Sequence, residues 1–115
     1  MAPEQAALVE RLRSLLSAEP TVREVSMFGG RSITVNEKMI VAAQRDGALL
    51  VRVAADRHEE LLTAPGAAQA EMGAGRDMGP GWIEVAPAVM ESDDGLVFWV
   101  DAALEYNRAV TDGAV

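Results

Sequence analysis

Short turns separate the apolar segments in the first half of the chain, and this spacing limits the folds that it can adopt. Three dipeptides are typical of tight hairpin turns: Gly29-Gly30, Asn36-Glu37 and Asp46-Gly47. Four β-type runs lie around them: 22–28, 31–35, 38–44 and 48–53. Because such short connections cannot hold a helical crossover, neighbouring strands must be antiparallel. The sequence therefore predicts an antiparallel meander.

Apolar residues with helical spacing precede the predicted sheet. They fall at i, i+4, i+7 and i+8, on one face of a helix: Leu8, Leu12, Leu15 and Leu16. Pro20 ends this segment, because proline disfavours helical geometry in the residue before it. We therefore expect a helix from about Pro3 or Glu4 to about Ala18. Docking on the protein's own core explains its stripe better than binding to a partner or a membrane.

A second helix is predicted after the meander, over residues 56–63. Asp56 is its expected N-cap, and Glu59, three positions later, is the expected capping-box partner. A looser glycine-containing stretch, 67–81, then leads into a further strand at 82–85. The second half of the chain is thus predicted to add one or two strands to the same sheet.

A third helix closes the chain. Its N-cap is expected at one of three short polar residues that can accept the first free N–H groups: Ser92, Asp93 or Asp94. Its predicted core stripe is Leu96, Val100, Ala103 and Leu104. The full order is α, three or four β, α, one or two β, α. This order predicts an α+β fold, a two-layer sandwich with helices on one face of the sheet.

Helices on one face leave the opposite sheet face without cover from the same chain. Strand alternation places Leu50 and Arg52 on that face. From the last strand it carries one of two alternating pairs: Trp82 and Glu84, or Ile83 and Val85. Trp82 is the candidate of greater interest, since a tryptophan on a sheet surface often marks a contact.

Composition restricts the classes of partner. The chain has 115 residues and no internal linker, which predicts one domain over residues 1–115. It has no cysteine, which excludes disulfides and a cysteine nucleophile and is compatible with the reducing cytoplasm. The formal net charge of −8 disfavours direct binding to nucleic acid or anionic lipid. No segment approaches the roughly 20 apolar residues of a membrane span, and we expect no signal peptide or anchor.

The residues that carry chemistry do not form a recognisable catalytic or metal-binding set. The single histidine belongs to His58-Glu59-Glu60, consecutive side chains that diverge on a helix and are expected on a solvated face. Glu91, Asp93 and Asp94 lack calcium-loop spacing and suit helix capping. Four methionines are expected to fill gaps in the core rather than to form a soft-metal surface: Met27, Met39, Met72 and Met78. We expect no metal and no cofactor.

A glycine-rich loop over residues 73–81 is the one segment that suggests a ligand. Closely spaced glycines expose backbone N–H groups, and Arg76 adds a positive charge that suits a carboxylate or phosphate. However, the loop has no Walker lysine and leads into a strand rather than a helix. A connection into the last strand is the preferred interpretation. The alternative is a small-ligand cradle in which Arg76 approaches the turn at Met27 and Phe28.

Five sequence blocks, in order, resemble the TfoX/Sxy N-terminal domain family, over about Arg23 to Asn107. They are Met27-Phe28-Gly29-Gly30, Asn36-Glu37-Lys38-Met39, Leu50-Val51-Arg52-Val53, Gly75-Arg76-Asp77-Met78 with Gly81 to Val85, and Trp99-Val100 with Ala103-Leu104. The family commonly has glycine where Glu37 stands and proline where Asp77 stands, and the segment before Trp82 is about one residue longer here. The resemblance implies a fold like that of type III secretion chaperones, with no recognised catalytic residues and no known cofactor. Since family members linked to competence carry a second domain and this chain ends at Val115, we do not transfer that role.

The sequence thus predicts a small cytoplasmic, non-enzymatic binding or regulatory module that acts through protein contact. The predicted contact surface is the uncovered sheet face with Leu50, Arg52, Trp82 and Glu84. The partner is another protein or a second copy of the chain. The alternative function is a binder, or an enzyme, of an anionic metabolite that uses the 73–81 loop and Arg76.

Overall fold

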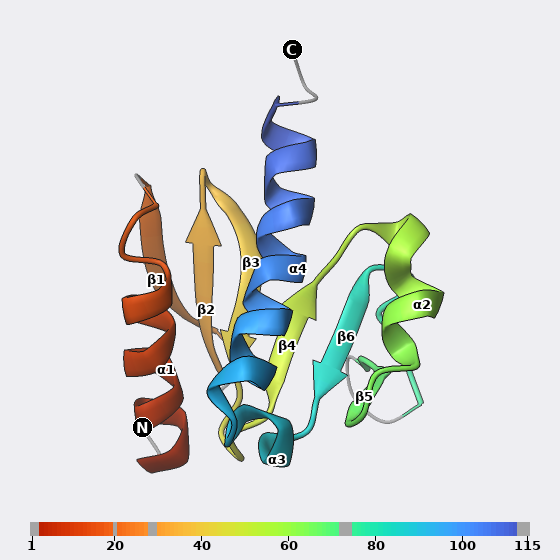
Figure 1. The fold of residues 1–115 in the computed structure, drawn as a ribbon, viewed down its shortest axis with the longest axis horizontal. Coiled ribbons are helices and arrows are strands. Elements are labelled where there is room, and N and C mark those ends of the chain that lie inside the picture. The colour runs from red at the N-terminus through yellow and green to blue at the C-terminus, as the bar shows by residue number, and fades with distance from the viewer. Residues whose placement is uncertain (1–2, 20, 28–29, 72–74, 113–115) are drawn as a thin grey trace.

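The computed structural model describes the chain except for residues 1–2, 20, 28–29, 72–74 and 113–115 (Figure 1). The helices are α1 (Pro3–Leu15), α2 (His58–Leu62), α3 (Pro87–Met90) and α4 (Asp93–Asp112), with a 3-10 turn, η1 (Ala55–Arg57), before α2. The strands are β1 (Val22–Met27), β2 (Gly30–Val35), β3 (Lys38–Ala43), β4 (Leu49–Arg52), β5 (Ala67–Gln69) and β6 (Trp82–Val85). None of the described helices is long and apolar enough to cross a membrane.

The six strands form one antiparallel sheet in the order β1-β2-β3-β4-β6-β5. The predicted meander of the first four strands and the α+β class are confirmed. β6 pairs with β4, and β5 adds to the outer side of β6, so the chain passes through the edge strand before it returns to the centre. β5 lies in the stretch that was predicted as loose.

Two hairpin turns set the register of the first three strands. Val35 pairs with Lys38, so Asn36 and Glu37 form a two-residue turn, and both have positive φ, 53° and 69°. This is the left-handed backbone that hairpin turns of the mirror-image type require. In the first hairpin Met27 pairs with Gly30, which makes Gly30 the first residue of β2 rather than part of the turn. Phe28 and Gly29 lie outside the described residues.

Helices α1 and α4 lie side by side against one face of the sheet, with α2 beside β6 (Figure 1). Between these layers is a continuous apolar core in which Trp99 of α4 is the largest fully buried side chain. Leu12 of α1 and Val51 of β4 are completely buried there. Burial of apolar side chains of this size stabilises the fold by about 1.5–3 kcal/mol each. The predicted two-layer arrangement with helices on one face is therefore confirmed.

Several helix boundaries differ from the predictions. Asp56 is not an N-cap: it lies inside η1, where the backbone N–H of Arg57 already bonds to the carbonyl of Ala54 at 2.9 Å. The capping box is therefore wrong, and no side chain caps the start of α2. By contrast, the expected cap of the last helix is confirmed, because Ser92 Oγ accepts the N–H of Gly95 at 3.2 Å.

Three further features depart from the expectations. α1 ends at Leu15 rather than near Ala18, because the backbone tightens there and Ser17 bonds back to the carbonyl of Ser14. α3, a single turn that starts at a proline, had no counterpart among the predicted elements. The expectation of core methionines is wrong for Met39 and Met78, which are half-buried and outside the core cluster. Among the methionines whose burial the structure describes, Met90 is the buried one, because α3 packs against α4.

Candidate functional site

The pairing of β4 with β6 decides which side chains share the uncovered sheet face. Leu50 is directly opposite Glu84, and Arg52 is directly opposite Trp82. Residues that pair across two strands lie on the same face of a sheet. Ile83 and Val85, the alternative pair, are fully buried on the helix side. The uncovered face therefore carries Leu50, Arg52, Trp82 and Glu84, and this set is called the β4–β6 patch below.

The same face continues across the whole sheet. One row of paired residues runs from β1 to β5: Val25, Ser32, Ala42, Leu50, Glu84 and Ala68. Ser32 and Ala42 of this row are only 4% and 5% exposed. Val25, at the end of the row, is 45% exposed.

Arg52 is held in place by two aromatic rings. Its guanidinium carbon lies 4.9 Å from the ring centre of Trp82 and 4.7 Å from that of Tyr106. Tyr106 belongs to α4, so Arg52, the last residue of β4, joins the end of the sheet to the helix layer. Cation–π contacts of this kind contribute about 0.5–1 kcal/mol each at accessible positions. Arg52 thus organises the patch, in which all four side chains are half-buried.

His58 is buried, which contradicts the prediction of a solvated face. Its side chain is 6% exposed because α2 packs against β5 and β6. The backbone N–H of Gly81 donates to His58 Nδ1 at 2.8 Å, and His58 Nε2 lies 2.7 Å from Gln69 Oε1. Since Nδ1 accepts a hydrogen bond, Nε2 carries the proton and donates to Gln69. Both ring nitrogens are therefore used to hold β5 and the start of β6 together.

The candidate ligand loop lies next to β5 and β6, and residues 72–74 are outside the described part. Gly75, Arg76 and Asp77 are exposed, and Arg76 makes no ion pair or hydrogen bond to another described residue. β5 and β1 are at opposite edges of the sheet. Six strands at about 4.8 Å spacing place those edges more than 20 Å apart. The postulated approach of Arg76 to the β1–β2 turn therefore does not occur.

The remaining residues of the family blocks are dispersed through the molecule. Trp99 is buried in the core, Met39 is half-buried on β3, and Gly30 begins β2. They stabilise strands, turns and packing rather than converging on one point. Among the described residues, no group of three or more His, Asp or Glu side chains is placed to hold a metal ion.

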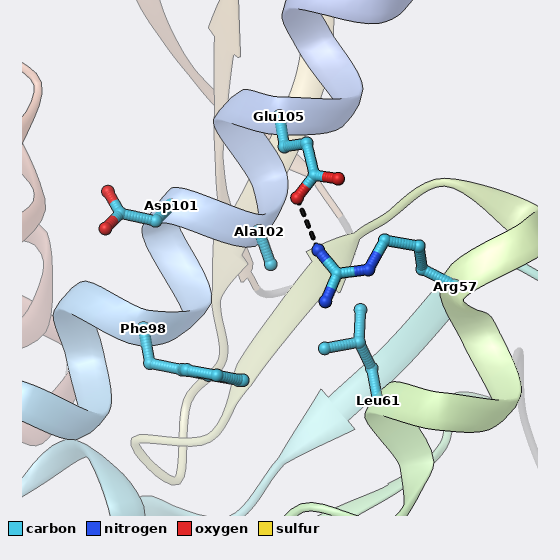
Figure 2. Close-up of a pocket in the computed structure, with 6 residues that line it drawn as sticks. All are labelled: Arg57, Leu61, Phe98, Asp101, Ala102 and Glu105. Carbon is cyan, nitrogen blue, oxygen red and sulfur yellow. Dashed lines mark hydrogen bonds and ion pairs between the residues drawn. The ribbon is translucent and has the colours of Figure 1, made fainter.

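A hollow of about 170 Å³ between α2 and α4 was not predicted. Figure 2 shows Leu61 and Ala102 facing one another across it, with Phe98 on one side and Arg57 on the other; Asp101 points away. Phe98 is 48% exposed, and its ring packs edge-on against Trp99 with the ring centres 5.2 Å apart. The sequence feature that could have indicated this hollow is Phe98, an aromatic residue of the last helix that lies outside its predicted core stripe.

The charge in this hollow is already neutralised. Arg57 pairs with Glu60 at 3.1 Å and with Glu105 on α4. The hydrogen bond to Glu60, together with the negative charge of Glu105, raises the pKa of Arg57, so the guanidinium stays charged. An incoming anion would have to displace two carboxylates. The hollow therefore offers a small apolar surface rather than an anion site.

Comparison with known families agrees with this architecture. The sequence model of the TfoX N-terminal domain matches residues 14–106, which includes the end of α1, the whole sheet and most of α4. The chain has no significant match among curated proteins. Because the matched region covers most of its 115 residues, the chain belongs to the TfoX N-terminal domain family.

Proposed function

We propose that the protein is a non-catalytic module that binds another protein chain through the uncovered face of its sheet. The observation that carries this proposal is the separation of the two faces: the described helices pack on one side, and the β4–β6 patch lies on the other. A sheet face with apolar and aromatic side chains gains stability when a partner removes them from water. We place this role in the cytoplasm, since a chain without cysteine needs no oxidising compartment.

The composition of the β4–β6 patch favours a protein partner over other ligands. Trp82 is half-buried and stacked by Arg52, so it would contribute apolar area with little loss of side-chain entropy on binding. Leu50 provides an aliphatic contact next to it, and Glu84 a charged group across the strand.

The test compares two variants that replace an apolar residue with aspartate on opposite sides of the molecule. Leu50→Asp places a charge in the patch, whereas Val97→Asp changes a 38% exposed valine on α4 and serves as the matched control. Each tagged protein is used for affinity capture, and every recovered partner is then purified and titrated directly. We expect Leu50→Asp to weaken binding by at least about tenfold, and Val97→Asp to bind like the wild type.

Circular dichroism melting curves of both variants establish that they fold. If Leu50→Asp does not fold, Leu50→Ser replaces it, because serine removes the aliphatic contact without adding a charge. The proposal is wrong if purified partners bind both variants as tightly as the wild type, or if neither capture nor self-association detects any protein contact.

A further inference from the structure

The two edges of the sheet differ in how they are protected against pairing with another strand. β5, at one edge, has three residues, and short edge strands pair poorly. β1, at the other edge, has six residues with no proline and no irregularity in its pairing with β2. It also carries two of the exposed large apolar side chains, Val22 at 36% and Val25 at 45%. β1 is therefore the edge that is open to an additional strand.

The β1–β2 register shows which backbone groups of β1 face outward. The N–H of Asn36 donates to the carbonyl of Thr21 at 3.0 Å, which makes this a hydrogen-bonded pair at the end of the ladder. Because hydrogen-bonded pairs alternate along an antiparallel ladder, Arg23 with Thr34 and Val25 with Ser32 belong to the same series. The N–H and C=O groups of Val22, Glu24 and Ser26 therefore face away from β2.

We propose that two copies of the chain pair through β1, antiparallel, with Val25 opposite Val25 of the second copy. In a two-fold pair, residues whose backbone groups face outward in one copy must lie opposite such residues in the other copy. Only a few registers satisfy this condition, and in each of them one residue of β1 lies opposite the same residue of the second copy. A centre at Arg23 or Glu24 sets like charges opposite each other, which is unfavourable. A centre at Val25 avoids this conflict, places Glu24 opposite Ser26, and pairs the backbone over residues 23–27.

The charges around β1 allow this approach although the chain is acidic as a whole. Glu24 receives two hydrogen bonds from Arg13, at 2.5 and 2.8 Å, and Arg31 lies 3.7 Å away. Arg13 and Arg31 therefore flank the one carboxylate of β1, and Arg23 adds a positive charge on the opposite face of the strand. The edge is thus a region where two copies with a net charge of −8 can meet without a concentration of carboxylates. Added salt screens the remaining long-range repulsion, so we expect the pair to tighten as ionic strength rises.

This inference rests on the proposed protein-contact function and names a second copy as one partner. Edge pairing would join two six-stranded sheets and extend the uncovered face across both copies. The β4–β6 patch stays accessible in such a pair, because it lies on the face and not at the β1 edge. A dimer through β1 and a different partner on the patch are therefore compatible.

The test uses Ser26→Pro with Ser26→Ala as its matched control. Proline removes the N–H of residue 26, which faces outward and makes no bond to β2, and proline is tolerated on edge strands at such positions. Alanine removes the same hydroxyl and keeps the N–H. Light scattering after size exclusion measures the mass of each protein over a range of concentrations. We expect dimers for the wild type and Ser26→Ala, and at least about a tenfold higher dissociation constant for Ser26→Pro.

Hydrogen exchange gives a direct readout of the register. In the dimer the amides of Glu24 and Ser26 are expected to be protected, and the protection is lost on dilution to the monomer. If Ser26→Pro does not fold, Val25→Lys tests the edge pairing in its place. It replaces an exposed side chain, removes the Val25 contact and sets two like charges opposite each other. We expect this variant to be a folded monomer.

Two results overturn the edge pairing. One is a wild type that stays monomeric at sub-millimolar concentration and high salt. The other is a dimer that forms as tightly in Ser26→Pro and Val25→Lys as in the wild type. If Leu50→Asp then disrupts that dimer, the two copies meet through the sheet face, and the proposed protein-contact function stands. Failure of the edge pairing alone leaves the capture experiment with the β4–β6 patch unaffected.

Discussion

Replacement of Glu37 by glycine should stabilise the protein, because Glu37 has a backbone conformation that suits glycine. Its φ is 69°, in the left-handed region, and its neighbour Asn36 has φ 53°. Asparagine tolerates this region, whereas a glutamate pays the steric cost of its Cβ, about 1–2 kcal/mol. Glu37 is exposed and makes no hydrogen bond or ion pair to another described residue, so its side chain offers little compensation.

The expected net gain follows from two opposing effects. Glycine at position 37 relieves about 1–2 kcal/mol of strain in the folded state. It also raises the conformational entropy of the unfolded chain, which lowers the free energy of unfolding by about 0.5–1 kcal/mol. The difference is a stabilisation of about 0.5–1 kcal/mol. For a domain of this size, such a gain raises Tm by a few degrees, roughly 2–6 °C.

Urea denaturation followed by tryptophan fluorescence measures this change. Glu37→Ala is the matched control: it removes the same carboxylate but retains the Cβ, so its free energy of unfolding should stay within about 0.5 kcal/mol of the wild type. The m-value should be the same for all three proteins, since the turn is a local change. The reasoning fails if Glu37→Gly is no more stable than Glu37→Ala.

Two other predictions concern local packing and charge. A glycine-to-alanine substitution inside a helix is usually stabilising, but Gly95→Ala should lower the free energy of unfolding by about 1–3 kcal/mol, because a Cβ at this position would lie 2.3 Å from the carbonyl oxygen of Val89. An unchanged or higher urea midpoint would contradict this. Glu24→Gln should be less stable than the wild type at neutral pH, because hydrogen bonds from Arg13 hold the pKa of Glu24 below its usual 4.5. That stabilisation is present above the unfolded-state pKa of Glu24 and is lost as the pH falls through its lower folded-state pKa. The urea midpoints of the wild type and Glu24→Gln should therefore converge between pH 7 and acid, and a constant difference between them would contradict the pairing.

Local patterns predicted those parts of the fold that depend on neighbouring residues in the chain. The short turns at Asn36-Glu37 and Asp46-Gly47 required antiparallel strands whatever the rest of the molecule did. Alternation along β4 likewise placed Leu50 and Arg52 on one face. In contrast, the choice between Trp82 and Ile83 depended on the register of β6 against β4, and no local signal sets that register.

Predictions about individual side chains failed where burial depends on distant segments. His58 has the sequence context of a solvated helix residue, between Arg57 and Glu59, yet β5 and the Gly81 backbone close around it. Similarly, Phe98 lies off the core stripe of α4, and it borders a hollow only because α2 packs next to that helix.

The sequence alone thus determined the antiparallel meander, the helix stripes and membership of the α+β class, because turn geometry and periodicity act over a few residues. Tertiary structure decided the place of β6 between β4 and β5, the cation–π stack of Arg52 on Trp82 and Tyr106, and the exposed edge at β1. These features come from contacts between segments far apart in the chain, where packing of the whole core selects one arrangement among several that are locally acceptable.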